Sequence, residues 1–353
     1  MIKEYTVQMP SVIPGPWTRE ARALAVSHEV RQAFISYFRK AMKVRNWTPW
    51  DDLPLAEMRE RGHLLSDDTV TIIEGYLGVE DYVGDYVEEG LRAVDGMRER
   101  RNLQLSWGME ELKHAEAWEL VLFHSGQRTE EALAAYRDRV AAHKWRMGQE
   151  HPGLDTPLGT VCYAMVQERA TYFNYEEMRK RIRSDYGLPA DLTPMERARG
   201  QQIGAAGAFK TVANDEIAHH GIFLEVVRIN MRYFPHETLD TILQVYRGFQ
   251  MPALELIPNG NAFAAAMERT LLHTPIKHVR FVSNPILDAL GLRNKRALER
   301  AVQQSKLLPP GLGPEHVALG RDGEFVVSMT PDPEPSHDPA LTAADGLASA
   351  SRS

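Results

Sequence analysis

Hydrophobic residues recur at steps of three and four along most of the chain, which is the spacing of one face of an α-helix, and strand-type alternation is scarce. The pattern predicts six long helices, at 18–43, 67–95, 102–124, 128–148, 157–185 and 193–231. Three shorter helices are predicted at 236–249, 262–273 and 293–306. The sequence therefore predicts an all-α fold.

The ends of two long helices carry clear signals. Thr156-Pro157 places an N-capping threonine before a proline in the first turn, and Thr193-Pro194-Met195-Glu196 has the spacing of a capping box. Beyond residue 310 the helical pattern ends. Short apolar runs on either side of Asp322-Gly323 predict a small hairpin within 311–329. Residues 330–353 are rich in Pro, Ala, Ser and Asp, which predicts a disordered tail after a helical domain at 1–310.

Composition narrows the chemistry. No apolar run reaches about 18 residues, so we expect no membrane span. A net charge of −7 disfavours a general nucleic-acid binder. Cys162 is the only cysteine, which excludes disulfide frameworks and thiolate metal sites. With no signal-peptide pattern at the N-terminus, we expect a cytoplasmic protein whose metal ligands, if any, are Glu, Asp and His.

Four Glu-x-x-His pairs occur in the chain. They are Glu60/His63, Glu111/His114, Glu216/His219 and Glu334/His337. The first lies where loops interrupt any helix and the last lies in the tail, so both are interpreted as surface charge. The other two fall inside apolar stripes of predicted helices, where residues i and i+3 share a face that points to the core. A lone carboxylate there would cost several kcal/mol, so these pairs predict a compensating cation.

Two more predicted helices carry one glutamate each in such a stripe, Glu80 and Glu168. Either alone would be explained by a salt bridge between helices. Together with the pairs, they give four Glu and two His from four helices, which balances two divalent cations. Oxygen and imidazole ligands without thiolate suit iron or manganese. This arrangement is that of a ferritin-like four-helix bundle that holds two metal ions, here with additional flanking helices.

The motifs around these residues resemble those of the soluble acyl-carrier-protein desaturases, over roughly residues 20–290. The resemblance is carried by Gln167-Glu168-Arg169-Ala170-Thr171, Glu110-Glu111-Leu112-Lys113-His114, Asp215-Glu216-Ile217-Ala218-His219, Asn46-Trp47-Thr48-Pro49 with Asp52-Leu53-Pro54, and Met251-Pro252-Ala253. Lys113, Ala115 and Ile217-Ala218 depart from the family pattern, and none of them is a ligand position.

The resemblance implies a di-iron centre with two Fe²⁺ ions and the same six metal ligands, Glu80, Glu111, His114, Glu168, Glu216 and His219. It further implies that Thr171 delivers protons on the oxygen-binding side; the alternative is a helix threonine bonded to a backbone carbonyl. Asp215 would hold a ligand histidine, with Glu110 in the equivalent place before the other ligand pair. Trp47 would carry electrons through Asp215 to the metal.

The function that the resemblance implies is O₂-dependent introduction of a cis double bond into an acyl chain on acyl carrier protein, in fatty acid biosynthesis. The expected partners are that carrier protein and a ferredoxin-type electron donor, and the expected assembly is a homodimer. Two alternatives stay open: a related di-iron hydroxylase or oxidase of carrier-bound acyl groups, and a non-catalytic ferritin-like iron-binding protein. An apolar tunnel past the metal pair would favour an enzyme.

Overall fold

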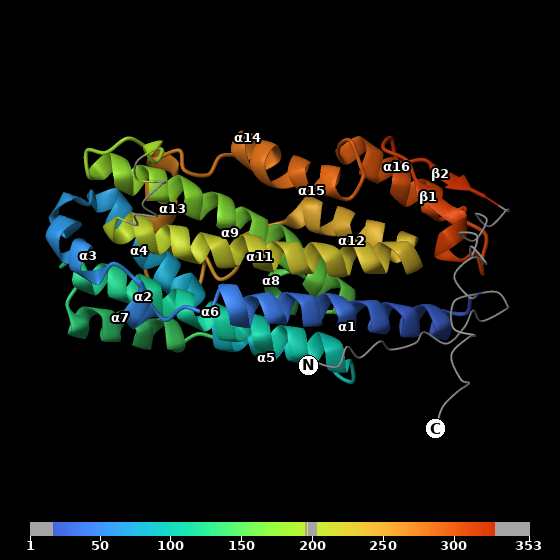
Figure 1. The fold of residues 1–353 in the computed structure, drawn as a ribbon, viewed down its shortest axis with the longest axis horizontal. Helices are drawn as coiled ribbons and strands as arrows, with labels where there is room; N and C mark the ends of the chain where they lie inside the picture. Colours follow the sequence, from blue (N-terminus) through green and yellow to red (C-terminus); the bar gives the residue numbers. More distant parts are fainter. Residues whose placement is uncertain (1–16, 195, 197–202, 329–353) are drawn as a thin grey trace, which may run out of the picture.

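The computed structural model describes residues 17–194, 196 and 203–328, and it is helical apart from one small hairpin (Figure 1). The longer helices are α1 (Arg19–Val44), α4 (Asp67–Glu80), α5 (Val83–Ala93), α6 (Arg98–His124), α7 (Glu130–Ala141), α9 (Pro157–Asp185), α11 (Gly204–Tyr233), α12 (Pro235–Gly248), α13 (Gly260–Arg269) and α16 (Lys295–Ser305). The predicted all-α fold is confirmed.

Short elements connect these helices. They are α2 (Pro49–Asp52), α3 (Leu55–Arg61), η1 (Gly62–Leu64), α8 (Met147–Glu150), α14 (Pro275–His278), the π-helical η2 (Val279–Ser283), α15 (Asn284–Ala289) and η3 (Pro314–His316). Strands β1 (Val317–Leu319) and β2 (Phe325–Val327) pair antiparallel, as the Asp-Gly signal predicts. Among the described helices, none is long and apolar enough to cross a membrane.

Helices α4, α6, α9 and α11 form the central four-helix bundle, in which α9 and α11 pack against each other most extensively (Figure 1). Each of the four contributes one aromatic side chain to a shared layer: Tyr76, Trp118, Tyr175 and Phe209. Trp118 stacks on Phe209 with 4.2 Å between ring centroids, and Tyr76 meets Tyr175 edge-on at 4.9 Å. The layer seals one end of the bundle interior against water.

The remaining helices flank this bundle. Helix α1 lies against α6 and α11, α5 lies against α6 and α9, α12 packs on α9 and α11, and α13 packs on α4 (Figure 1). The hairpin packs on the helical body through the partly buried Leu319 and Phe325. The bundle with additional helices is the predicted architecture.

The stretch predicted as one helix over 67–95 is two helices, α4 and α5, with a turn at Asp81–Tyr82. The Tyr86 hydroxyl donates to the Val79 carbonyl at 2.9 Å, an oxygen that the amide of residue 83 would bond in an unbroken helix. A tertiary contact therefore ends α4 at Glu80, a candidate ligand.

The helix predicted over 128–148 was also too long, because α7 ends at Ala141. The Trp145 amide donates to the Asp85 carboxylate at 2.8 Å, and the Trp145 ring packs edge-on against Tyr86 at 4.8 Å. No glycine or proline marks this break in the sequence. Packing of a large aromatic side chain decides it.

The helix predicted over 193–231 has its capping box, in which the Thr193 amide donates to Glu196 at 2.6 Å and the Glu196 amide donates to Thr193 at 3.2 Å. Ile203 is extended, however, and α11 starts only at Gly204, so the prediction of one continuous helix was wrong. Residues 195 and 197–202 lie outside the described part, as does the predicted tail at 330–353.

Candidate metal centre

The six predicted ligands meet inside the four-helix bundle. Glu80 is the last residue of α4, Glu111 and His114 lie in the middle of α6, Glu168 lies on α9, and Glu216 and His219 lie on α11. None of these side chains is more than 6% exposed. Four carboxylates in a protein interior are stable only with a positive charge among them.

The six side chains form two groups that share two carboxylates. One group is Glu80, Glu111, His114 and Glu216, and the other is Glu111, Glu168, Glu216 and His219. Within each group, one ligand atom per residue can be chosen so that all four lie within 4.8 Å of one another. Each group therefore has room for one ion, and Glu111 and Glu216 lie where they would bridge the two ions.

The two histidines face these shared carboxylates through the same ring atom. His219 Nδ1 lies 2.7 Å from Glu111 Oε1, and His114 Nδ1 lies 3.3 Å from Glu216 Oε1. Glu80 and Glu168 each belong to one group only. Each group thus has one glutamate and one histidine of its own and the two shared glutamates, and these four residues would hold one ion.

Several inward atoms of this cluster make no well-aligned hydrogen bond within the described structure, although His219 Nδ1 and Glu111 Oε1 lie 2.7 Å apart. The atoms without such a bond include Glu111 Oε1, Glu168 Oε2, both Glu216 oxygens, and the Nδ1 atoms of His114 and His219. Buried polar atoms are rarely left unpaired, so a site with several of them calls for a bound ion or ligand. Since every one is a lone-pair donor of the kind that iron and manganese accept, the residues fit a pair of such metals.

The electrostatics agree with that fit. Burial and the nearby Glu111 and Glu216 carboxylates raise the pKa of Glu80 and of Glu168 well above the usual range. Burial works against charged imidazoles, but the surrounding anionic groups outweigh it and raise the pKa of His114 and His219. Without cations the cluster therefore retains protons, which incoming metals must displace.

Two aromatic residues hold the two unshared glutamates in place. Trp107 Nε1 donates to Glu168 Oε1 at 3.1 Å, and the Tyr175 hydroxyl donates to Glu80 Oε1. In each carboxylate one oxygen is fixed by this bond while the other is left for a metal. From the sequence both residues appear only as members of apolar stripes; their polar atoms on the same helix face as the ligands were the available signal.

A second carboxylate lies behind each histidine. Asp215 Oδ2 lies 3.4 Å from His114 Nε2, and Glu110 Oε2 lies 3.4 Å from His219 Nε2. Each acid therefore serves the histidine of the other helix. Such outer carboxylates fix the tautomer and ring orientation of metal-binding histidines. The placement of Asp215 next to a ligand histidine agrees with the prediction.

Basic side chains pair with these outer carboxylates, and aromatic side chains donate hydrogen bonds to them. Asp215 accepts a hydrogen bond from Trp47 Nε1 at 2.7 Å and lies 3.4 Å from Lys113 Nζ. Arg45 lies 3.4 Å from Glu110 and 3.8 Å from Asp215, and Tyr37 donates its hydroxyl to Glu110. Trp47 thus has the predicted contact with Asp215, while its role in electron transfer stays a prediction.

Thr171 lies on the same helix as Glu168 and is 3% exposed, but its hydroxyl donates to the Gln167 carbonyl at 3.1 Å. This backbone bond is the alternative that the sequence left open for Thr171, and proton delivery stays a prediction. The Glu60/His63 pair is exposed and lies apart from the cluster, as expected. Glu334 and His337 lie outside the described residues.

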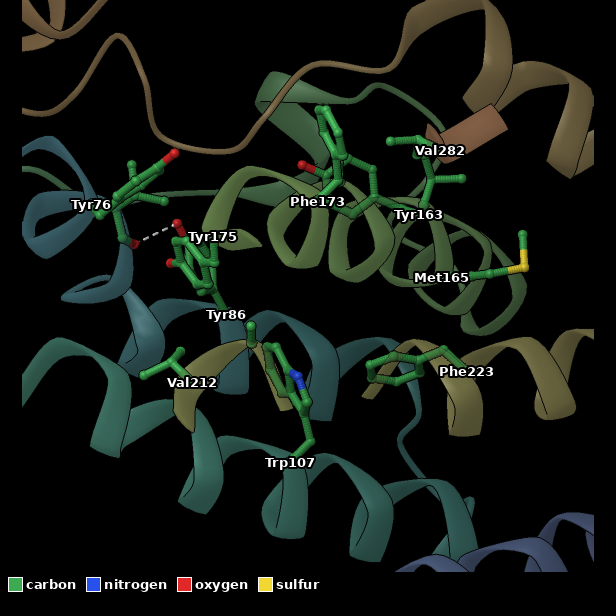
Figure 2. Close-up of a cluster of buried hydrophobic side chains, with 14 of the residues drawn as sticks. Tyr76, Tyr86, Trp107, Tyr163, Met165, Phe173, Tyr175, Val212, Phe223 and Val282 are labelled. Atoms are coloured by element: carbon green, nitrogen blue, oxygen red, sulfur yellow. Dashed lines mark hydrogen bonds between the residues drawn. The ribbon is translucent and has the colours of Figure 1, made fainter. Parts of the chain in front are cut away.

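One cavity lies beside Trp107, the residue that donates to Glu168, and none of the six candidate ligands lines it. It measures about 50 Å³, and its lining includes Gln104, Trp107, Tyr163, Gln167 and Phe223. Figure 2 shows Tyr76 and Tyr175 at one end of the aromatic core and Trp107 and Phe223 farther along the bundle. A volume of this size holds only one or a few water molecules, so an acyl chain enters it only when lining side chains rotate.

No family model and no curated protein matches the chain. Several solved structures are similar. An R2-like ligand-binding oxidase from Sulfolobus acidocaldarius shares 13% identity, with 80% of this chain and 93% of that one covered and a TM-score of 0.45. A point mutant of an R2-like ligand-binding oxidase with an anaerobically reconstituted Mn/Fe cofactor shares 13% identity over 74% of this chain and 92% of that one, with a TM-score of 0.44. Likeness this distant assigns no ligand or reaction to the chain.

Proposed function

We propose that this chain is an O₂-dependent oxidoreductase with a carboxylate-bridged centre of two metal ions. The observation that carries the proposal is the pair of four-residue groups that share Glu111 and Glu216, whose ligand atoms are buried and lie close together inside the described bundle. Bound there, two iron ions, or one iron and one manganese, supply the electrons that reduce O₂ and the oxidising power to attack a C–H bond.

The surrounding residues position and insulate this centre. Trp107 and Tyr175 orient Glu168 and Glu80, while Asp215 and Glu110 orient the two histidines. The aromatic layer above the cluster keeps water from one side, which protects an oxidation from side reactions. The contact of Trp47 with Asp215 supports an electron route from the outer part of the molecule toward His114.

The finer assignment is desaturation of an acyl chain on acyl carrier protein, with a ferredoxin-type donor and a homodimeric enzyme. It is supported by the motif resemblance around Glu111, Glu168 and Glu216. Hydroxylation or another oxidation of an acyl group uses the same residues and is the second candidate. Iron storage is the third candidate, and the product assay described next separates it from the two enzymes.

The test is reconstitution without oxygen, using ferrous iron and a ferredoxin reducing system, followed by O₂ and palmitoyl- or stearoyl-carrier protein. Mass spectrometry of the acyl group distinguishes loss of two hydrogens, which is desaturation, from gain of one oxygen, which is hydroxylation. Glu111→Gln is the control and should give neither product. Iron oxidation without any change in carrier-bound or free fatty acyl substrates would refute the proposed enzyme and leave iron storage.

A further inference from the structure

The cavity beside Trp107 and a larger surface groove meet at a single cationic side chain, Arg100. The groove measures about 600 Å³ and lies between α1, the first turns of α6 and α9, and the end of α11. Its apolar lining includes Val26, Val30, Leu158 and Phe234. Arg100 lines both the groove and the cavity, so it stands where the two meet.

The charge of Arg100 is not balanced by a described carboxylate. Its guanidinium donates to the Pro157 carbonyl at 2.9 Å, and among the described residues no acidic group lies within ion-pair distance. The one acid in the cavity lining, Glu89, is already paired with Arg92 at 2.9 Å and with Arg146 at 2.8 Å. Burial lowers the pKa of Arg100 to about 10, which still leaves it charged at neutral pH.

The local backbone adds to this positive field. Pro157 is the first residue of α9, a helix of 29 residues, so the positive end of the helix dipole lies next to Arg100. A partly buried guanidinium without an acidic partner, beside a helix N-terminus, is a site for an anion that accepts two hydrogen bonds, such as a carboxylate. The cavity lining beyond it includes five aromatic side chains, which suit a hydrocarbon chain on that anion: Tyr86, Trp107, Trp145, Tyr163 and Phe223.

Helix α6 links this site directly to the metal centre. Arg100, Gln104, Trp107 and Glu111 follow one another at steps of four, three and four, so they lie on one face of the helix. About eleven residues at about 1.5 Å each separate Arg100 from Glu111 by about 16 Å. An extended chain advances about 1.2 Å per bond, so roughly a dozen bonds span this distance.

We propose that Arg100 binds the carboxylate of an amphipathic organic acid whose hydrocarbon chain runs past Gln104 and Trp107 toward the metal centre. This assignment rests on the proposed oxidoreductase and, in place of the carrier-bound acyl group, names the free acid as its substrate class. A carrier-bound thioester has no negative charge at that end of the chain. Gln104, which donates to the Tyr86 carbonyl at 3.2 Å, is the side chain that must rotate to admit the chain.

The test compares dodecanoate with dodecanol, below their aggregation limits, on the full chain with and without iron. Binding is followed by calorimetry and by the fluorescence of Trp107 and Trp145, which line the cavity. We expect dodecanoate to bind about ten- to a hundredfold more tightly than dodecanol. Arg100→Gln should abolish this preference, and Arg100→Lys should keep most of it.

Arg101→Gln is the matched control, because Arg101 neighbours Arg100 but pairs with the exposed Asp95 and lines neither space. It should bind like wild type. Equal binding of the acid and the alcohol, no binding of either, or a preference that survives Arg100→Gln would overturn the inference. Iron content measured on the same samples tests the proposed metal centre separately. The binding of dodecanoate to metal-free protein does not depend on the metals.

Discussion

The sharing of Glu111 and Glu216 between two ligand groups makes a stoichiometric prediction. Wild-type protein should bind two metal ions per chain. Glu80→Gln removes a ligand from one group and Glu168→Gln from the other, so each variant should keep one tight ion. Glu111→Gln removes a ligand from both groups at once and should weaken both ions together.

The effect of bound metal ions on the melting temperature of the protein can be estimated. At a free metal concentration about one hundred times the dissociation constant, each ion stabilises the folded state by about 2.7 kcal/mol. With about 2.1 cal/mol/K per residue over 353 residues, the entropy of unfolding is about 0.74 kcal/mol/K near the midpoint. Two ions should therefore raise the melting temperature by about 7 °C, and one ion by about half as much.

The assay is anaerobic titration with ferrous or manganous ion, read by elemental analysis and by calorimetric melting. Metal-free variants should melt at or above the metal-free wild type, because each Glu→Gln change removes a buried carboxylate from a crowded acidic cluster. This control separates ligand loss from misfolding. If Glu80→Gln and Glu111→Gln lost the same number of ions, or if wild type bound fewer than two, the bridged arrangement would be wrong.

Other contacts make three further predictions. Trp107→Phe keeps an aromatic side chain, smaller than indole, but removes the donor to Glu168, so metal affinity should fall about ten- to a hundredfold in the same titration. Thr171→Val should leave the fold and metal content near wild type while lowering the yield of oxidised product per O₂ consumed; an unchanged yield would leave Thr171 only its backbone bond. Burial lowers the pKa of His151 from 6.5 to about 4, so an unfolded chain binds the proton first and stability should fall as the pH drops from 6.5 to 4. In urea unfolding, the drop in the free energy of unfolding from pH 7 to pH 4 should be about 2–3 kcal/mol smaller in His151→Leu than in wild type. An identical pH dependence in the variant would contradict this.

The clustering of the six candidate ligands could be predicted from the sequence, because charged side chains are rarely buried in a protein core without a compensating partner. Acidic residues and histidines inside apolar stripes of four helices have few explanations, and the structure brings all six together. The exposed Glu60/His63 pair shows why the motif alone was insufficient, since the same spacing on an irregular surface segment has no such constraint. The Glu-x-x-His pairs could be told apart because two of them lie within apolar stripes of predicted helices and the other two do not.

The helix breaks could not be predicted, because the contacts found at them join side chains of neighbouring elements, which the apolar pattern does not report. The turn after Glu80 depends on the Tyr86 hydroxyl bonding the Val79 carbonyl, and the end of α7 depends on Trp145 packing against Tyr86. Both contacts involve Tyr86. The periodicity of apolar residues continues across the two breaks, so a local pattern predicts uninterrupted helices.

The two acid pairs Glu110-Glu111 and Asp215-Glu216 show how one helix can provide both a candidate metal ligand and a carboxylate that orients a histidine of another helix. Consecutive residues on a helix point about 100° apart, so the second acid of each pair faces the cluster while the first faces the neighbouring helix. Glu110 on α6 thus lies at His219 on α11, and Asp215 on α11 lies at the His114 of α6. Each helix thereby orients the histidine of the other, and the separation of α6 and α11 is coupled to the geometry of both ligand groups. A shift between these two helices would misplace both histidines together, which is a physical reason for the extra packing of α1 across α6 and α11.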